Sequence, residues 1–472
     1  MKSTPILYRL AAAALLFIPA LAHGQGQLAP PGAAYPYPNE RALNGAMAPV
    51  PSMKTLMQID AGEHIPNRTA ANTNLNGSLG HYVLANPGRY YLTENLDKRI
   101  LITADNVTID LGGFEVRYTG AGVGPIGIEA QSGVAGTVVR TKIINGRIIG
   151  KWSTGIQLND FSVVTGVDVG GADTYGIKIG NSGLVDQCRT SAGWAPGPQA
   201  PGPGPHSGIF AGEAAVISSC NASGIRGTGI QCMDNSRVTD CTVNQVAGCG
   251  IVTAHSGSVG GCSVRTCGVT GFDLNSGSAL FNSTAESCGG AGVHVRNACT
   301  LQNVNSILNL NHGFLVENIA PPNTPPVLDN ATNFLQCLAQ SNTGDGFLVT
   351  SQCTFTHCTA DKNGTAGQIG SPPGSGDGFR FGNGCRLSNC TASQNIDDGF
   401  QGDNANTLDQ NSALANGDNG IELTTDQNIV IRNTLRANTT APMQPAAGAG
   451  GLAPTMLPSA PPPVNPFANF SL

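Results

Sequence analysis

The sequence predicts an all-β fold, a parallel β-helix of about twelve coils of 21 residues with three short strands in each coil. The first reason is a repeat in which Gly is followed by Ile, Val or Phe, and eight of its eleven steps are 21 residues long. The second is composition, because 63 Gly with only 11% charged and 5% aromatic residues suit tight turns and short strands better than long helices. The repeating glycines are Gly155, Gly176, Gly208, Gly229, Gly250, Gly271, Gly292, Gly313, Gly346, Gly378, Gly399 and Gly420.

The spacing of apolar residues within a repeat indicates strands. Counted from the Gly as offset zero, offset one is Ile, Val or Phe in every repeat, and weaker small or apolar columns stand at offsets three, seven, twelve and fourteen. Offset nine is apolar throughout, with the members Val164, Val185, Ile217, Val238, Val259, Leu280, Leu301, Phe334, Phe355, Leu387, Leu408 and Ile429. These offsets form three pairs two residues apart, which is strand alternation. We expect each coil to stack on the previous one at about 4.8 Å.

A column of Asn at offset seventeen predicts a ladder of amide hydrogen bonds from coil to coil. Its members are Asn309, Asn342, Asn363, Asn395 and Asn416. We expect these residues in turns, because Asn tolerates the left-handed conformation.

Segments of different composition flank the repeats. Residues 1–22 have the basic start, apolar stretch and small residues of a signal peptide, and residues 23–55 form an Ala/Pro/Gly-rich disordered linker. Residues 56–150 are expected to form an N-terminal cap with the first coils, residues 151–438 the β-helix, and residues 439–472 a disordered Pro/Ala-rich tail. The signal peptide predicts a secreted or periplasmic protein with no transmembrane segment after its removal.

One stretch resembles a known superfamily. The phrase LANPGRYYLTENL followed by ILITADNVTIDLGGFEV, within residues 84–116, resembles the opening of bacterial right-handed parallel β-helix proteins of the pectate-lyase-like superfamily. The resemblance implies a right-handed helix over about residues 80–438. It implies no single activity, since the superfamily includes lyases, hydrolases, epimerases and adhesins. The chain lacks the Arg-x-Pro-x-x-Arg of pectate lyases, the Asp-Pro-His-Glu of alginate epimerases and the Arg-Ile-Lys of polygalacturonases, so no catalytic residue is transferred.

Ten of the 14 cysteines fall in two inward columns. Offset twelve holds Cys188, Cys220, Cys241, Cys262, Cys337, Cys358 and Cys390, and offset seven holds Cys299, Cys353 and Cys385. Cys in a packed stack most often acts as a small buried apolar residue. Two alternatives stay open, a Zn²⁺ site of Cys353, Cys358, Cys385 and Cys390, and disulfides between neighbouring coils, of which Cys267 with Cys288 is the most plausible.

The outward positions of the first strand carry the candidate catalytic residues, which are Asp273, His294, Arg296 and Glu317. Coil stacking pairs Asp273 with His294 at about 5 Å, and Arg296 with Glu317 at a similar distance. Two further residues at these offsets, Asn275 and Arg380, are candidate substrate-binding residues.

Three inserts, at residues 193–206, 319–330 and 365–376, border this strand and predict walls for a groove. A His and an Arg beside carboxylates fit a sugar acid. In a lyase, Arg296 or His294 would abstract the proton beside the uronate carboxylate; in a hydrolase, Asp273 and Glu317 would be acid and base. The alternative is a solvated face whose ion pairs contribute about 0 to 1 kcal/mol each.

The position before the repeating Gly carries the candidate metal ligands Asp345, Asp377 and Asp398, with Asp397 and Asp403 nearby. Asp before Gly is also a common turn pair. Carboxylates stacked near 5 Å repel, so we expect a raised pKa or a bound cation, for which Ca²⁺ is the natural choice.

Charge excludes one class of partner. A net charge of −6, with 24 Lys and Arg and no basic run, argues against nucleic acid. Two classes of function remain. The first is an exported protein that binds or processes an acidic polysaccharide or cell-surface glycan, as a lyase or a hydrolase would. The second is a non-enzymatic surface or matrix protein with a structural or adhesive role.

Overall fold

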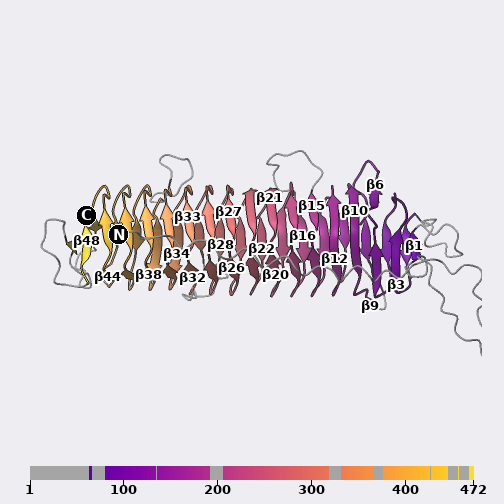
Figure 1. The fold of residues 1–472 in the computed structure, drawn as a ribbon, viewed down its shortest axis with the longest axis horizontal. Coiled ribbons are helices and arrows are strands. Elements are labelled where there is room, and N and C mark those ends of the chain that lie inside the picture. Colours follow the sequence, from indigo (N-terminus) through magenta and orange to yellow (C-terminus); the bar gives the residue numbers. More distant parts are fainter. Residues whose placement is uncertain are drawn as a thin grey trace, which may run out of the picture. The chain divides into compact units, whose positions relative to one another are not determined.

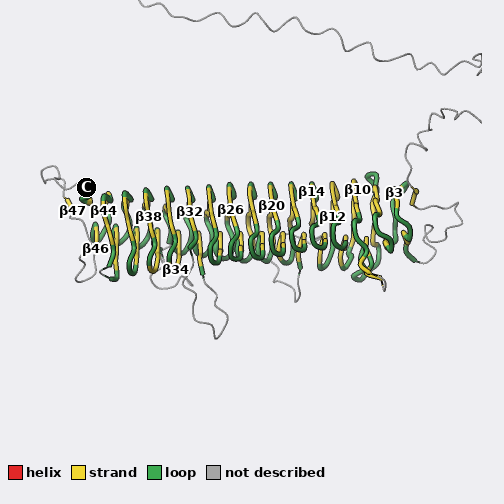
Figure 2. Tube along the Cα trace, turned by 90° about the horizontal axis from the view of Figure 1, so that it is seen from below, coloured by secondary structure: helices red, strands yellow, loops and turns green. Residues whose placement is uncertain are grey.

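The computed structural model describes residues 63–65, 80–133, 136–191, 206–317, 331–364, 376–425, 427–444, 455–456 and 467–471. The expected signal peptide, the linker and all but the ends of the three inserts lie outside these residues. The described part of residues 62–472, one compact unit, is a stack of coils built from strands and turns (Figures 1 and 2). No helix of the described residues has the length and apolar character needed to cross a membrane.

The first strand of each coil belongs to one sheet of 16 strands, which pair in parallel (Figure 1). In order they are β2 (Tyr82–Leu84), β4 (Ile100–Ile102), β7 (Ile128–Ala130), β11 (Thr154–Gln157), β13 (Tyr175–Ile179), β16 (Ser207–Ala211), β19 (Thr228–Cys232), β22 (Ile251–Thr253), β25 (Phe272–Leu274), β28 (Val293–Val295), β31 (Phe314–Val316), β34 (Phe347–Ser351), β37 (Phe379–Asn383), β40 (Phe400–Gly402), β43 (Ile421–Leu423) and β46 (Met443–Gln444). We call this the 16-stranded sheet. The twelve predicted repeats supply β11 to β43, and further coils precede and follow them.

The second and third strands of each coil stack on their own counterparts and are linked in a second sheet. The second strands are β3 (Gly88–Leu92), β5 (Val107–Asp110), β14 (Leu184–Asp186), β17 (Val216–Ser218), β20 (Arg237–Thr239), β23 (Ser258–Gly260), β26 (Ala279–Phe281), β29 (Thr300–Gln302), β32 (Asn333–Leu335), β35 (Thr354–Thr356), β38 (Arg386–Ser388), β41 (Thr407–Asp409) and β44 (Ile429–Ile431). The third strands are β6 (Glu115–Tyr118), β15 (Arg189–Ser191), β18 (Asn221–Ser223), β21 (Thr242–Val246), β24 (Ser263–Cys267), β27 (Thr284–Glu286), β30 (Asn305–Ile307), β33 (Leu338–Gln340), β36 (Thr359–Asp361), β39 (Thr391–Ser393), β42 (Ser412–Leu414) and β45 (Thr434–Arg436).

Two long strands, β10 (Lys142–Gly150) and β12 (Val163–Gly170), belong to both stacks. The remaining strands are β1 (Glu63–Ile65), β8 (Ser132–Gly133), β9 (Gly136–Thr137), β47 (Thr455–Met456) and β48 (Asn469–Ser471). Apart from the antiparallel pair β8 and β9, the pairings are parallel, as the repeat predicts.

The predicted inward register is confirmed with one exception. Phe379 and Phe400 at offset one are fully buried, and so are the offset-nine residues up to Leu408. Ile429 is wrong, because it is 51% exposed while Val430 is buried and pairs with Leu408. The cause is one extra residue in the last repeat. The backbone N–H of Asn406 donates to Oδ1 of Asn428, which is 22 residues later, whereas the regular spacing is 21.

The close stacking of coils explains why the repeat is marked by Gly. A Cβ atom on Gly346 would lie 2.6 Å from the carbonyl oxygen of Gly378, and a Cβ on Gly378 would lie 2.6 Å from that of Gly399. Contacts this short exclude any side chain. The Gly column is therefore required by the approach of one coil to the next.

Stacked phenylalanines fill the core of the later coils. The rings of Phe314, Phe347 and Phe379 lie parallel, with successive centroids 4.6 and 4.7 Å apart. Phe334 and Phe355, from the facing sheet, form a second stack and meet Phe347 edge-on at 5.7 and 5.6 Å. Offset-stacked and edge-on rings are the preferred aromatic arrangements, so these columns add specific contacts to apolar burial.

We expect Phe347→Ala to lower the free energy of unfolding by about 3–5 kcal/mol, because it opens a cavity in both stacks. The neighbouring Leu348, whose side chain points outward from the same strand, provides the control. Urea unfolding should show a much smaller effect for Leu348→Ala. Equal losses in the two variants would contradict the packing described.

The Asn ladder is confirmed, but its predicted conformation is wrong. Nδ2 of Asn342 donates to Oδ1 of Asn363 (2.9 Å), and Nδ2 of Asn363 donates to Oδ1 of Asn395 (3.0 Å). The left-handed residues are those immediately before the ladder, namely Leu308, Ser341, Lys362, Gln394 and Ala415. The left-handed residue bends the chain, so that the side chain of the following Asn points inward and is buried.

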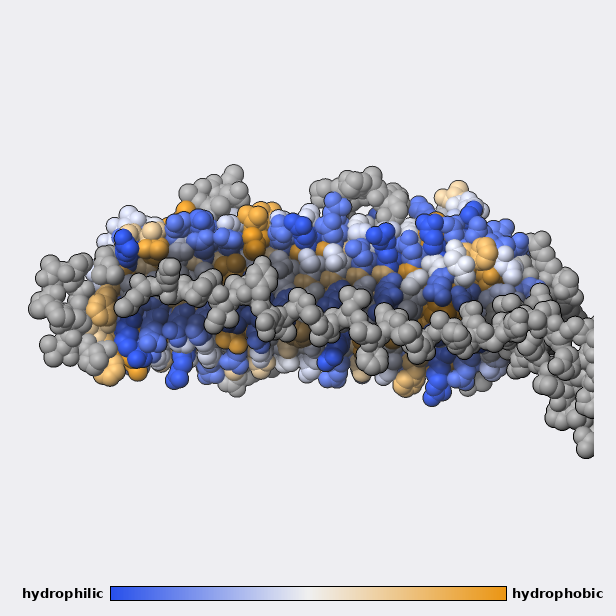
Figure 3. All heavy atoms as spheres, in the orientation of Figure 1, coloured by the Kyte–Doolittle hydropathy of each residue, from blue (hydrophilic) through white to orange (hydrophobic). Residues whose placement is uncertain are grey.

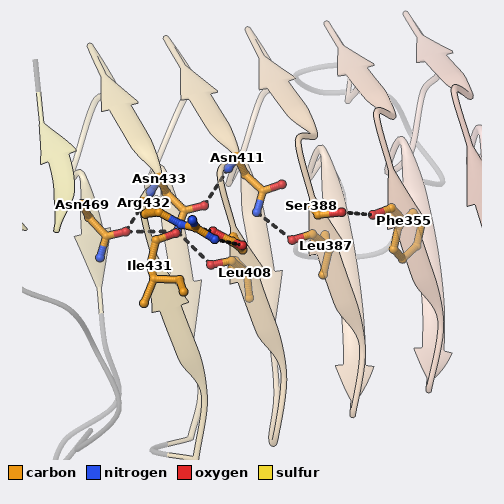
Figure 4. A network of polar contacts seen from close by, with 10 residues as sticks. Phe355, Leu387, Ser388, Leu408, Asn411, Ile431, Arg432, Asn433 and Asn469 are labelled. Atoms are coloured by element: carbon orange, nitrogen blue, oxygen red, sulfur yellow. Dashed lines mark hydrogen bonds and ion pairs between the residues drawn. The ribbon is translucent and has the colours of Figure 1, made fainter. Parts of the chain in front are cut away.

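A second ladder reaches the C-terminal strand (Figure 4). The backbone N–H of Asn411 donates to Oδ1 of Asn433 (2.8 Å), and Nδ2 of Asn433 donates to Oδ1 of Asn469 (3.0 Å). Asn469 is fully buried and begins β48, which pairs with β45. For residues 469–471 the expectation of a disordered tail is therefore wrong, because these residues continue the coil stack.

All 14 cysteines are free, and all but the partly exposed Cys249 are buried. Thiols at offset twelve donate to backbone carbonyls two residues earlier, as Cys220 does to Ser218 and Cys241 does to Thr239 (both 3.1 Å). No disulfide joins Cys267 and Cys288, and no described group of three or more thiols is close enough to hold a metal ion. The interpretation as small buried residues is the one that this structure supports.

We expect thiol titration of the denatured mature protein to find most of the 14 cysteines free, while the native protein reacts slowly because its thiols are buried. A count below about four in the denatured protein would contradict the ladder and indicate disulfides.

Candidate functional site

One row of outward side chains runs along the 16-stranded sheet from β13 to β46. Its members are the successive register partners Lys178, Phe210, Gln231, Val252, Asp273, His294, Leu315, Leu348, Arg380, Gln401, Glu422 and Gln444. We call this the outward row. Neighbouring members are about 4.8 Å apart along the stack axis. Any ligand that lies along the rod meets these side chains in order.

The structure brings the four candidate catalytic residues together at the middle of the outward row. Nδ1 of His294 lies 3.1 Å from Oδ1 of Asp273, as stacking predicts. The second predicted pair differs, because Arg296 Nη1 lies 3.7 Å from Asp273 Oδ1 instead of meeting Glu317. Glu317 Oε2 lies 3.9 Å from Nε2 of His294. Asp273 is thus the centre of the group.

Exposure decides what each member can do. The His294 side chain is 13% exposed and Asp273 is 24% exposed, whereas Glu317 is 51% exposed. Nε2 of His294 is covered and has no hydrogen-bond partner. The carboxylate of the exposed Glu317 lies 3.9 Å from it, so a change in the position of this side chain would open Nε2 to a ligand.

The two candidate substrate-binding residues differ in position. Asn275 directly follows β25, the strand of Asp273, and its Oδ1 accepts the backbone N–H of Ser276 (2.8 Å). Arg380 is on the outward row, three coils beyond His294 and therefore roughly 14 Å away.

The acidic column is built as a ladder. Oδ1 of Asp345 accepts the backbone N–H of Asp377 (3.0 Å), Oδ1 of Asp377 accepts that of Asp398 (3.0 Å), and Oδ1 of Asp398 accepts that of Asn419 (2.8 Å). His312 precedes them, and its Nδ1 accepts the backbone N–H of Asp345 (3.1 Å). Each carboxylate therefore uses one oxygen for coil stacking, and the second oxygen remains for other chemistry.

Burial strongly disfavours charge on two of these carboxyl groups. Burial, reinforced by the charges of Asp345 and Asp398, raises the pKa of Asp377 to about 9. Burial and a hydrogen bond with Glu422 raise the pKa of Asp398 to about 8. Of the two outcomes expected for this column, burial favours a raised pKa, and a bound cation stays a prediction.

The group that can hold a cation differs by one member from the sequence prediction. Carboxylate oxygens of Asp377, Asp397 and Asp398 lie within 4.8 Å of one another, so Asp397 takes the place expected for Asp345. Asp345 Oδ2 instead faces Nδ1 of His312 at 3.5 Å. Oδ2 of Asp377 is buried without a hydrogen-bond partner. Oxygen donors with one unsatisfied member fit a hard cation such as Ca²⁺.

The predicted Asp403 lies outside this group. Its Oδ1 accepts the hydroxyl of Thr424 (2.8 Å) in an exposed turn at another corner of the coil. Asp397 directly precedes Asp398 in the sequence. Only the positions of the carboxylate oxygens show that Asp397 belongs with Asp377 and Asp398.

The fold and a family comparison agree. Residues 126–280 and 239–376 match the family model of the right handed beta helix region, which covers more than half of the chain. The chain belongs to the right-handed β-helix family. This confirms the fold and the handedness that the opening stretch implied. No curated protein sequence matches the chain.

Solved structures with a similar fold include enzymes and an adhesin. The mannuronan C-5 epimerase AlgE4 A-module of Azotobacter vinelandii is 12% identical over 78% of this chain and 91% of its own, with a TM-score of 0.35. Pectate lyase Pel9A is 14% identical over 75% of this chain and 70% of its own, with a TM-score of 0.27. PfbA, a surface adhesin of Streptococcus pneumoniae, is 10% identical over 77% and 93%, with a TM-score of 0.31. These similarities concern the fold alone.

Proposed function

We propose that this is an exported β-helix protein that binds a linear acidic polysaccharide along the outward row and cleaves it by β-elimination. The observation that carries the proposal is the Asp273, His294 and Arg296 group at the middle of that row. The view in Figure 3 shows many hydrophilic residues on the described surface, with hydrophobic ones among them. Export rests on the signal-peptide pattern of residues 1–22.

The reaction needs a base and a group that neutralises the uronate carboxylate. Nδ1 of His294 lies 3.1 Å from Asp273 Oδ1, so Nε2 is the nitrogen that acts as the base, and it takes the proton from the carbon that bears the carboxylate. The electron pair left behind forms the new C=C bond as the bond to the glycosidic oxygen breaks. The proton held by His294 then passes to the leaving oxygen. The planar, positively charged guanidinium of Arg296 can bind the carboxylate of the uronate residue.

Hydrolysis fits less well. It needs two carboxyl groups on opposite sides of the scissile bond, one as acid and one as base or nucleophile. Asp273 already contacts both His294 and Arg296, so it serves to orient them. Glu317 alone would have to perform both steps.

Binding without turnover is the second candidate. The observation that favours it is the covered Nε2 of His294, which a substrate reaches only if Glu317 moves aside. The outward row would then serve an adhesive or matrix protein as a glycan-binding face.

We further propose that Asp377, Asp397 and Asp398 bind Ca²⁺. Glu422 of the outward row is hydrogen-bonded to Asp398, so a cation here would adjoin the same face. It would hold the later coils together and leave the chemistry to the His294 group.

The deciding experiment incubates the mature protein with a panel of uronate polysaccharides, with and without Ca²⁺. The ultraviolet absorbance of the unsaturated product reports cleavage, and a pull-down with the insoluble polymer reports binding. Product formation supports the lyase. Binding without product supports the second candidate, and neither binding nor product would overturn both.

A further inference from the structure

We infer that Tyr175, Phe210 and Lys178 form a separate subsite that holds one sugar-acid residue of the polymer, with the ring on the aromatic side chains and the carboxylate on Lys178. The inference rests on the proposed function, because it assumes an acidic polysaccharide along the outward row. It adds a place where the chain is held, away from the site of cleavage.

The three side chains form one cluster on two adjacent coils. The rings of Tyr175 and Phe210 meet edge-on with centroids 5.7 Å apart. Nζ of Lys178 lies 5.2 Å from the centroid of Tyr175 and 5.8 Å from that of Phe210. All three are partly exposed on the outer face of the 16-stranded sheet. Lys178 Nζ lies over both rings, and aromatic side chains with such a neighbouring cation can contact an apolar sugar-ring face and an anion together.

Their position in the register links the cluster to the candidate site. Lys178 and Phe210 are neighbouring members of the outward row, and Phe210 is three coils from Asp273. Three steps at about 4.8 Å give a separation of roughly 14 Å. A linear polymer parallel to the rod axis would therefore pass over the aromatic cluster and the His294 group in one stretch.

A small cavity is present in the same part of the stack, and none of the three cluster residues lines it. It is lined by residues of the same coils, among them Thr174, Thr190, His206, Ser207 and Arg226. Thr190 Oγ1 is buried without a hydrogen-bond partner, although its side chain lines this cavity. The cavity has a volume of about 10 Å³, which is room for one hydroxyl group or water molecule. Because Thr190 is fully buried, the cavity lies inside the coils and is not part of the subsite.

Cations lie on or beside the outward row, together with the carboxylates of Asp273 and Glu422. Lys178 and Arg380 are members of the row, Arg296 lies beside its middle, and Gln231 offers an amide between Lys178 and Arg380. Packing of Lys178 against the rings already keeps its ammonium group beside the aromatic surface. A neutral polymer would use the rings and leave the cations unused.

The test measures binding of uronate oligomers by calorimetry, with a short oligomer that covers the His294 group alone and a long one that spans at least four coils. Phe210→Ala and Lys178→Gln should each weaken binding of the long oligomer by about tenfold, since a ring contact or a charge-assisted contact is lost. Binding of the short oligomer should not change.

A matched control is present in the chain. The guanidinium carbon of Arg140 lies 5.7 Å from the ring centroid of Phe161, so Phe161 is another exposed aromatic residue paired with a cation. It lies at a corner of a coil, away from the outward row. Phe161→Ala should leave binding of both oligomers unchanged. Circular dichroism melting checks that each variant is folded.

The outcomes separate this inference from the proposed function. If the long oligomer binds to the wild type and Arg296→Ala weakens it while Phe210→Ala and Lys178→Gln do not, the subsite is wrong and the proposed function stands. If the wild type binds no uronate oligomer, both are overturned. If Lys178→Gln weakens a neutral oligomer equally, recognition of the carboxylate is wrong.

Discussion

His294→Gln is expected to lower the turnover of a uronate polysaccharide by about 10²- to 10⁴-fold, because it removes the group that accepts the proton. Gln keeps a polar side chain of similar reach on the same strand, so the coil should fold unchanged. The Michaelis constant should stay near the wild-type value, since the cations of the outward row still bind the polymer. Steady-state kinetics that follow the unsaturated product separate the two parameters.

The control for this prediction is a second His and Asp pair in the same chain. Nδ1 of His255 lies 3.3 Å from Oδ1 of Asp234, on a turn outside the outward row, and the His255 side chain is 59% exposed. His255→Gln should leave turnover unchanged. A similar loss in both variants would indicate an effect on folding rather than on the reaction.

Asp273→Asn distinguishes orientation from direct contact. Asn keeps the size of the side chain but removes the charge that fixes the histidine and pairs with Arg296. We expect a loss of turnover smaller than that of His294→Gln, accompanied by weaker binding because Arg296 is no longer held. An unchanged enzyme would show that the group is only an ion-paired surface, whose free-energy contribution is about 0 to 1 kcal/mol per pair.

The fold could be predicted because its rules are local and repeat. Alternation fixes which residues face inward, and a spacing of 21 residues superimposes them, so Phe379 and Phe400 were placed correctly. Ile429 was placed incorrectly because one extra residue in a turn leaves no mark in composition. The strand at residues 469–471 was missed because its partner lies more than 30 positions earlier, across a segment with no repeat.

The candidate site could be predicted only in part. The register predicted the contact between Asp273 and His294, since both are fixed by their backbone positions. Long side chains choose their own partners, and Arg296 turned to the carboxylate of the coil before it instead of the one after it. The aromatic pair could not be predicted from alternation alone, which places Phe210 outward, because Tyr175 is the register partner of Ser207 and the two rings meet only through their side-chain positions.

Removal of Ca²⁺ at alkaline pH is expected to give the largest change in stability. In the absence of a cation, burial raises the pKa of Asp377 to about 9 from an ordinary value of 3.8, so the folded protein keeps a proton that the unfolded chain loses. Between these two pKa values the folded state binds more protons, and stability falls as pH rises, by about 1.4 kcal/mol per pH unit for one proton. The loss is complete only above pH 9.

Calcium should reverse this trend. A cation between Asp377, Asp397 and Asp398 replaces the bound proton and stabilises the charged carboxylates. Melting curves should therefore show a small effect of Ca²⁺ near pH 5 and a large rise in melting temperature near pH 9. Because ligands that bind only the folded state stabilise it by mass action, the rise should grow with Ca²⁺ concentration.

Asp377→Asn tests both effects in one variant, and the chain itself shows that Asn fits this column. Asn419 is buried and occupies the same position two coils later. Its backbone N–H donates to Oδ1 of Asp398, just as the backbone N–H of Asp398 donates to Oδ1 of Asp377. The variant should lose the part of the alkaline destabilisation that Asp377 contributes, because its amide carries no proton to release, while Asp398 keeps its own part; it should also lose the response to Ca²⁺. Asp403→Asn, in an exposed turn outside the group, should retain both. If the Asp377→Asn protein still gains stability from Ca²⁺ at pH 9, the cation binds elsewhere; if the wild type shows no alkaline loss without Ca²⁺, the buried carboxyl groups are not held protonated.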